Sequence, residues 1–266
     1  MIGAITGDIV GSIYEFDNLK SKDFTLFGEG CKFTDDTVLT IAVADWLSTD
    51  TDLEECLTYW SYEYHTCSYG GMYRQWLDSW DRKPYNSFGN GAAMRVSPCA
   101  WWGTTQEEVL ELAKESAVVT HNHPEGIKGA QATALAIWLA RQDQTVDEIK
   151  EAVEKFSGYD LNQTVDDIRP DYRFDETCQG TVPQAIICAL EATDFEDAIR
   201  NAISIGGDSD TVAAITGSIA EAMFGVPEDI RAEALGYLTH GQKRLLASFV
   251  FLSPRGEQNA AAKEGE

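Results

Sequence analysis

Positive charge is scarce in this sequence of 266 residues. It holds 20 lysines and arginines against 44 aspartates and glutamates, which gives a formal net charge of −24. A surface with so few cations repels the phosphates of nucleic acids and of anionic membranes. We therefore expect neither nucleic acid nor a membrane as the main partner.

Long apolar runs are also absent. No stretch reaches the roughly 18 residues that a membrane-spanning helix needs. The first residues, MIGAITGDIVGS, lack the basic start of a secretory signal. The six cysteines form no C-x-x-C pair, so we expect neither a zinc site built on such pairs nor a disulfide framework. Together these features predict a soluble, cytoplasmic protein.

Alternating patterns of the kind that mark β-strands are missing, and helical periodicity takes their place. Apolar residues recur three and four apart in segments that are separated by short breakers. The segments are 38–47, 109–113, 130–138, 182–190, 195–203, 212–224 and 230–238. We predict an all-α fold, a compact single-domain orthogonal bundle of about a dozen helices. The domain is expected to span residues 1–252, followed by a flexible tail at 253–266.

The first predicted helix carries glycines at a spacing of four. Gly3, Gly7 and Gly11 lie on one face, where another element can approach the bare backbone closely. We expect these glycines to serve packing. Glu15 follows the helix among apolar neighbours, where a carboxylate needs a partner.

Two acidic clusters each stand directly before an apolar helix. Asp35 and Asp36 occur in FTDDTVLTIAVADWL, with Thr34 as a candidate N-cap. Asp208 and Asp210 occur in SIGGDSDTVAAITG. Taken alone, each cluster is explained by helix capping and by the helix dipole. If the helices bring the clusters together, the carboxylates must raise their pKa values or recruit a counter-ion, because neither motif contains a basic residue.

Hard divalent cations with oxygen ligands would neutralise such a cluster. Carboxylates, threonine hydroxyls and water suit Mg²⁺, Mn²⁺ or Ca²⁺ better than zinc. A calcium EF-hand does not fit, because the sequence after Asp208 lacks the glycine at the sixth loop position and turns apolar at Val212.

Five motifs, in this order, resemble the ADP-ribosylglycohydrolase family, which includes the dinitrogenase reductase-activating glycohydrolase. They are GAITGDIVGSIYEF, FTDDTVLTIAVADWL, FGNGAAMRVSP, THNHPEGIKGAQATALAIW and SIGGDSDTVAAITGSIAEAMFG. The resemblance runs from about residue 2 to about residue 226. It implies an all-helical enzyme with two divalent cations, Mg²⁺ or Mn²⁺, that cleaves ADP-ribose from a modified side chain or a related acceptor.

The resemblance also implies roles for individual residues. The implied metal ligands are Glu15, Thr34, Asp35, Asp36, Asp208, Asp210 and Thr211. Asp210 would bridge the two ions, and Asp35 or Glu15 would act as general acid or base. The implied contacts to ADP-ribose are Phe88, Asn90, Gly91, Met94, Arg95 and His121. Independently of the resemblance, Gly70 could let a phosphate or a ribose approach the backbone.

The expected reaction is attack of water on the anomeric carbon of the distal ribose, with ADP-ribose as product. The expected substrate is an ADP-ribosylated protein or a small ADP-ribosyl acceptor. Two alternatives stay open. One is a catalytically inactive relative that binds ADP-ribose or a nucleotide, and the other is a two-metal phosphohydrolase. The sequence leaves the acceptor linkage, to arginine, serine or another group, undetermined.

Overall fold

The protein is built from helices. The structure is a computed structural model that describes residues 1–254, and no residue in that range belongs to a β-strand. Gly89 and Thr177 form an isolated antiparallel bridge. The helices are α1 (Ile2–Gly11), α2 (Asp35–Ser48), α3 (Leu53–Glu63), α4 (Gly71–Leu77), α5 (Gly91–Met94), α6 (Ser97–Trp102), α7 (Gln106–Val118), α8 (Pro124–Arg141), α9 (Val146–Ser157), α10 (Val165–Ile168), α11 (Cys178–Leu190), α12 (Phe195–Ile205), α13 (Ser209–Phe224), α14 (Glu228–Tyr237) and α15 (His240–Leu252). The predicted all-α fold is confirmed.

Each segment with helical periodicity lies in a helix, with Leu238 just past the end of α14. The additional helices include α4, α5, α6 and α10, which are 4 to 7 residues long. A helix of one or two turns shows no periodicity that could predict it. The predicted tail lies, from residue 255 onward, outside the described residues. Up to residue 254, the structure contains no helix with both the length and the apolar content that a bilayer span requires.

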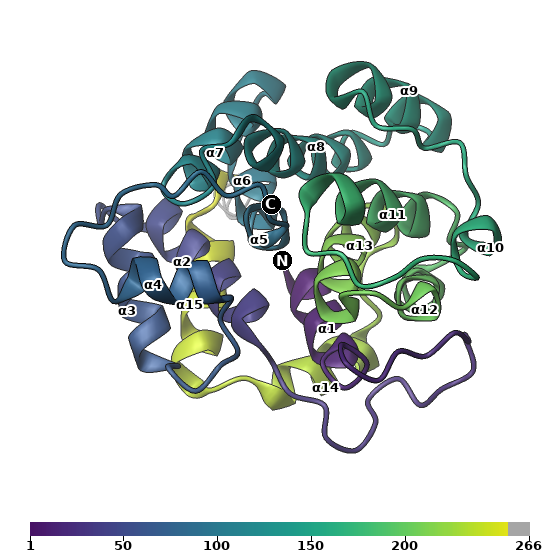
Figure 1. Cartoon of the computed structure of the whole chain (residues 1–266), viewed down its shortest axis with the longest axis horizontal. Coiled ribbons are helices and arrows are strands. Elements are labelled where there is room, and N and C mark those ends of the chain that lie inside the picture. The colour runs from purple at the N-terminus through teal and green to yellow at the C-terminus, as the bar shows by residue number, and fades with distance from the viewer. Residues whose placement is uncertain (255–266) are drawn as a thin grey trace, which may run out of the picture.

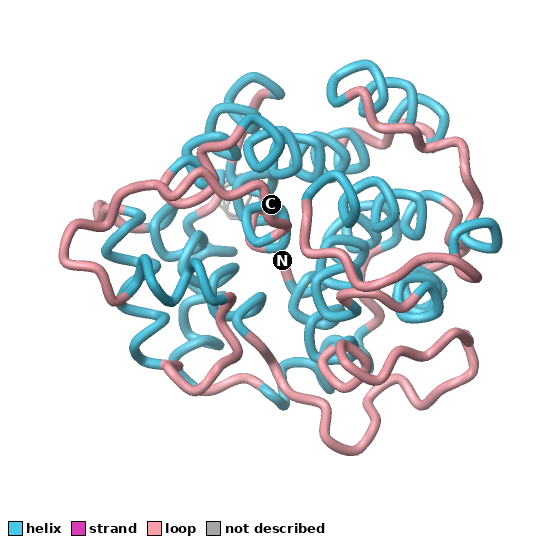
Figure 2. The backbone as a smooth tube through the Cα atoms, viewed as in Figure 1, coloured by secondary structure: helices cyan, strands magenta, loops and turns pink. Residues whose placement is uncertain are grey.

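The first helix and α13 pack side by side near the centre of the molecule (Figures 1 and 2). The glycines of α1 face the α13 backbone directly. A Cβ atom at Gly7 would lie 1.9 Å from the carbonyl oxygen of Ala213, and a Cβ atom at Gly11 would lie 2.5 Å from the Cα atom of Asp210. Any larger residue would therefore push the helices apart. The predicted packing role of the glycines is confirmed.

This contact determines where the acidic segments lie. Gly11 at the end of α1 rests on Asp210 in the first turn of α13. Asp8, in the last turns of α1, bonds to Thr34 and Thr37 at the start of α2. The C-terminal end of α1 and the N-terminal ends of α2 and α13 consequently meet at one place.

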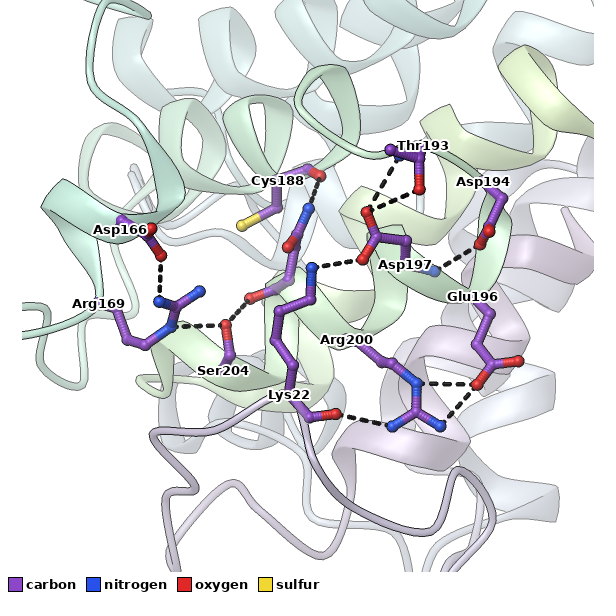
Figure 3. Close-up of polar contacts among 11 residues, drawn as sticks. Lys22, Asp166, Arg169, Cys188, Thr193, Asp194, Glu196, Asp197, Arg200 and Ser204 are labelled. Carbon is purple, nitrogen blue, oxygen red and sulfur yellow. Dashed lines mark hydrogen bonds and ion pairs between the residues drawn. The ribbon is translucent and has the colours of Figure 1, made fainter.

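The segment between α1 and α2, residues 12–34, contains no helix and is held on α12 by side chains. Figure 3 shows these contacts: the ammonium group of Lys22 pairs with Asp197, and Arg200 Nη1 donates to the carbonyl oxygen of Lys22 at 2.8 Å. Arg200 also donates to the carbonyl oxygen of Phe24 at 2.8 Å. Its guanidinium is oriented by Glu196, which accepts from Nε and Nη2 at 2.8 and 2.6 Å. The loop is therefore anchored to the helix rather than lying free on the surface.

We predict that Gly7→Ala lowers the free energy of unfolding by about 2 kcal/mol or more, because the new methyl group overlaps the α13 backbone. Gly236→Ala in α14 is the matched control, since no atom lies within 4 Å of a Cβ atom there. It should raise the free energy of unfolding by up to about 1 kcal/mol through helix propensity. Urea unfolding followed by circular dichroism, with chelator present, measures both changes. Equal stability of the two variants would contradict the packing constraint.

Candidate metal and substrate site

The meeting point of the three helix ends opens into a cavity of about 250 Å³. Of the fourteen predicted site residues, those that line the cavity are Glu15, Asp35, Asp36, Gly70, Asn90, Gly91, Met94, Arg95, His121, Asp208, Asp210 and Thr211. Thr34 and Phe88 are not among the lining residues. Phe88 is 44% exposed, and its ring packs against the ring of His123 at 5.3 Å. Thr34 lies beneath the acidic turn that it precedes.

The first acidic turn is shaped by Asp8, a residue that the sequence reasoning missed. The carboxylate of Asp8 accepts hydrogen bonds from the backbone N–H and the hydroxyl of Thr34, at 2.9 and 2.7 Å. It also accepts from the backbone N–H of Thr37 at 3.1 Å and from the Thr37 hydroxyl. Asp8 is fully buried, so these bonds replace its hydration. The available signal was a single charged residue within the otherwise uncharged segment MIGAITGDIVGS.

Thr34 is the N-cap of α2, as predicted from the sequence. Its hydroxyl oxygen accepts from the backbone N–H of Asp36 at 3.2 Å. Asp35 and Asp36 then follow in the first turn and face the cavity. The Oδ2 atom of Asp36 is buried and has no hydrogen-bond partner among residues 1–254. A buried carboxylate oxygen without a donor is available to a cation.

The second acidic turn brings three carboxylates close together. Glu15, Asp208 and Asp210 each offer an oxygen within 4.8 Å of the others. Asp208 is the N-cap residue of α13, yet its side chain makes no capping bond. It accepts instead from Asn90 Nδ2 at 2.7 Å, which fixes the direction of the carboxylate. These three residues form a group that could hold one metal ion.

Without a cation, the clustered carboxylates of the cavity are harder to ionise than free carboxylates. Burial, and next the charge of Asp210, raises the pKa of Glu15 to about 7. Burial also raises the pKa of Asp208 to about 6. The pKa values of Asp35, Asp36 and Asp210 are raised well above their usual range, again mainly by burial. None of the ion pairs within residues 1–254 involves any of these carboxylates.

Because every donor in this set is an oxygen, the cluster fits a hard divalent cation better than zinc or copper. Glu15, Asp208 and Asp210 satisfy the distances for one ion. Asp35 and Asp36 line the same cavity, but among the described residues only Glu15, Asp208 and Asp210 form a group whose oxygens all lie within 4.8 Å of one another. Their predicted contribution to a second ion stays a prediction.

Glu176 is a second lining residue that the sequence reasoning missed. It lies in the breaker IRPDYRFDETCQG, which carries no helical pattern. The structure places it through backbone bonds: its carbonyl oxygen accepts from the N–H of Asn90 at 2.7 Å, and Gly89 pairs with Thr177 beside it. Such backbone pairing between distant segments leaves no signal in a single sequence.

A further part of the lining surrounds His121. Arg95 is fully buried, and its Nη2 atom donates to the hydroxyl of Thr120 at 2.8 Å. The same hydroxyl is bonded to His121 Nδ1 at 2.7 Å. Burial, and secondarily the charge of Arg95, lowers the pKa of His121 well below its usual range. The cavity is therefore lined by a neutral imidazole near neutral pH.

Glycines leave room beside this imidazole. A Cβ atom at Gly91 would lie 3.2 Å from His121 Nε2, so the residue has to be small there. At Gly70 and Gly71 no atom lies within 4 Å of a Cβ position. The open backbone at the start of α4 gives a ligand access to the main chain.

The chain is similar in sequence and in fold to several known proteins. A sequence model of the family described as ADP-ribosylglycohydrolase matches residues 1–258. ADP-ribosylhydrolase ARH3 of Xenopus tropicalis is 25% identical over 320 residues, which covers 89% of this chain and 90% of that protein. ADP-ribosylarginine hydrolase Tri1 of Pseudomonas putida (strain GB-1) is 25% identical and covers 91% of this chain and 75% of its own. A solved structure described as an ADP-ribosylglycohydrolase-related protein complex shares the fold, with a TM-score of 0.71 at 23% identity over 96% of this chain and 97% of that chain.

We predict that the metal-free protein becomes less stable as the pH rises from 6.5 to 8. The pKa values of Glu15 and Asp208 in the folded state, about 7 and 6, lie above the ordinary values of 4.5 and 3.8. Their contribution to stability is therefore fully present below the ordinary pKa values and is lost as the pH rises through the folded-state values, so between pH 6.5 and 8 the remaining loss comes mainly from Glu15. His121, with its lowered pKa, has the opposite effect below pH 6.5, which is why the comparison starts there.

The melting temperature in chelator, and its increase on adding Mn²⁺, test this prediction. The increase should be larger at pH 8 than at pH 6.5, because the ion binds the ionised carboxylates. In Asp210→Asn both the pH dependence and the Mn²⁺ effect should shrink. A Mn²⁺ effect that is independent of pH in the wild type would show that these carboxylates are not the ligands.

Proposed function

The chain belongs to the ADP-ribosylglycohydrolase family, and we propose that it hydrolyses the glycosidic bond between ADP-ribose and a modified acceptor, using two divalent cations, Mg²⁺ or Mn²⁺. The observation that carries the proposal is the meeting of two acidic turns in one cavity, where no carboxylate forms an ion pair within residues 1–254. Arg95 also lines the cavity, but its guanidinium donates to Ser116 and Thr120 and not to the carboxylates. Similarity to ADP-ribosylhydrolase ARH3 and to ADP-ribosylarginine hydrolase Tri1 supports this class of substrate.

In this proposal the ligands divide between two ions. Asp35 and Asp36, with the hydroxyl of Thr34, would hold one ion, and the unpartnered Asp36 Oδ2 supports this assignment. Asp208 and Glu15 would hold the other ion. Asp210, the ligand that the family resemblance expects the ions to share, and Thr211 would complete that second set. When bound, the ions would supply Lewis acidity toward the ribose hydroxyls and toward water.

The side chains of the chain would direct the proton transfers. Water attacks the anomeric carbon, the glycosidic bond breaks, and the departing acceptor atom takes up a proton. Glu15 lines the cavity and is half-buried, so a carboxylate oxygen that a bound ion leaves free would accept the proton of the attacking water or return it to the acceptor. Asp35, on the other acidic turn, is the second candidate for this role. Asn90 donates to Asp208 Oδ2 and so orients this carboxylate, whose other oxygen would be available to the ion.

The remaining lining would bind ADP-ribose. Neutral His121 can donate or accept a hydrogen bond at Nε2 without adding a charge. Gly70 and Gly91 allow a phosphate or ribose to approach the backbone, and Met94 adds an apolar contact. Arg95 donates to Thr120 behind His121, which supports an indirect role through the imidazole. Phe88, exposed beside the cavity, would contact the ligand only at the rim.

The acceptor in this proposal is an arginine or serine side chain of a protein, or a small ADP-ribosyl acceptor. The name of the Pseudomonas putida relative includes ADP-ribosylarginine, which makes the arginine linkage the first to test.

The direct test is release of free ADP-ribose from arginine-linked and serine-linked ADP-ribosyl peptides, with Mg²⁺ and with Mn²⁺. We expect release from at least one peptide, and loss of release on adding chelator. Asp210→Asn should reduce kcat by more than about 100-fold, since it removes the proposed bridging ligand. Asp194→Asn is the matched control, because it makes the same change at the N-cap of α12, where asparagine caps equally well.

Other outcomes would favour the alternatives. Full activity in chelator or in Asp210→Asn would contradict a metal-dependent hydrolase. Release of inorganic phosphate or of a nucleoside monophosphate would indicate a phosphohydrolase. Tight binding of ADP-ribose without turnover of either peptide would indicate a binding protein.

A further inference from the structure

The side chain of Asn18 joins the two segments that carry the Glu15, Asp208 and Asp210 carboxylates. Its Nδ2 atom donates to the carbonyl oxygen of Glu15 at 3.1 Å and to that of Gly207 at 2.9 Å. Its Oδ1 atom accepts from the N–H of Gly207 at 2.8 Å. One carboxamide thus binds the backbone on both sides of the cluster, because this group can both donate and accept.

The hydrogen bonds between Asn18 and Gly207 restrain the backbone directly before Asp208. Helix α12 ends at Ile205, and α13 has Asp208 as its N-cap, so only two residues connect the helices. The two connecting residues are glycines with positive φ, 69° at Gly206 and 81° at Gly207. Residues other than glycine rarely adopt this backbone conformation. With the N–H and the C=O of Gly207 both bonded to Asn18, the two peptide groups on either side of the Gly207 Cα atom are held, and the second of them leads into Asp208.

On the Glu15 side of the cluster, no helix holds the backbone, and hydrogen bonds from Asn18 hold it instead. Glu15 lies past the end of α1, in the segment that contains no regular structure. Asn18 Nδ2 also lies 2.7 Å from the carbonyl oxygen of Tyr14. Because Nδ2 has only two hydrogens, one of them is shared between the neighbouring carbonyls of Tyr14 and Glu15, and this shared bond closes the turn that presents Glu15. The distance between Glu15 and Asp208 is therefore set by a side chain and not by helix packing alone.

Other anchors hold the rest of this segment. Lys20 Nζ donates to the carbonyl oxygens of Tyr172, at 2.8 Å, and Ile205. Farther along, Lys22 and Arg200 fasten the loop to α12 (Figure 3). Removing Asn18 would thus release the part of the loop next to Glu15 while the remainder stays docked.

We propose that Asn18 is a positioning residue for the metal site: it sets the separation of Glu15 from Asp208 and Asp210, and thereby the affinity for the ion that the three would share. The ionised carboxylates repel one another within 4.8 Å, so Glu15 moves away unless its backbone is tied to the second turn. The proposal rests on the metal dependence in the proposed function but not on the substrate. Removing a residue that orients a metal ligand costs about 10- to 100-fold in metal affinity.

The test is Mn²⁺ binding to the full chain by isothermal titration calorimetry at pH 7.5, well below the melting temperature of every variant. We expect Asn18→Ala to weaken at least one Mn²⁺ site by about 10- to 100-fold. Asn18→Asp keeps an acceptor for Gly207 but cannot donate. It should also weaken binding, although an added negative charge by itself would strengthen attraction of the cation. Asn18→Asp carries the test alone if Asn18→Ala does not fold.

Lys22→Ala is the matched control, because it removes one of the anchors between the same loop and α12, the ion pair with Asp197, at a distance from the carboxylates. It should lower the melting temperature and leave Mn²⁺ affinity unchanged within about 3-fold. Unchanged number and affinity of Mn²⁺ sites in both Asn18 variants, with wild-type binding intact, would overturn the positioning role alone. Absence of Mn²⁺ binding in the wild type would overturn the metal dependence on which the proposed function also rests.

Discussion

The close backbone contact between α1 and α13 is the constraint on which the site depends. Carboxylates that share a buried cavity repel one another and lose hydration, so they do not assemble by themselves. The glycine face of α1 lets the two helix backbones touch, with Gly7 against Ala213 and Gly11 against Asp210. Apolar packing along both helices thus supplies the free energy that holds charges together at their ends.

Hydrogen bonding distinguishes two kinds of acidic residue at these helix ends. Asp8 accepts from both the backbone and the hydroxyls of Thr34 and Thr37, so its carboxylate is already satisfied and serves to build the turn. Asp36 keeps a buried oxygen without a donor, and Asp208 makes no capping bond in its own helix. The carboxylates that keep an oxygen without a hydrogen-bond donor are the ones that can bind a cation. The sequence alone does not separate them from Asp8, because the hydrogen-bond partners become visible only in the folded structure.

The long helices and the acidic turns could be predicted because each has a signal in neighbouring residues: apolar periodicity for the helices, and paired carboxylates at a helix start for the turns. Periodicity locates α2, α8 and α13, and each acidic pair stands at a helix start. The roles of Asp8 and Asn18 depend on distant partners, Thr34 at 26 residues from Asp8 and Gly207 at 189 residues from Asn18, which no local pattern reveals. The motif match likewise could not tell that the ring of Phe88 lies outside the cavity, since neighbouring residues on a loop point in different directions.

The pairing of α1 with α13 also bears on how the chain folds during synthesis. Helix α1 packs against a helix that begins at residue 209, so all of the segments between α1 and α13 must be made before the two helices can meet. Until then α1 exposes an apolar surface that its neighbours in sequence do not cover. The acidic cluster is therefore completed late: a nascent chain that ends before α13 contains Glu15, Asp35 and Asp36 but lacks Asp210 and Thr211.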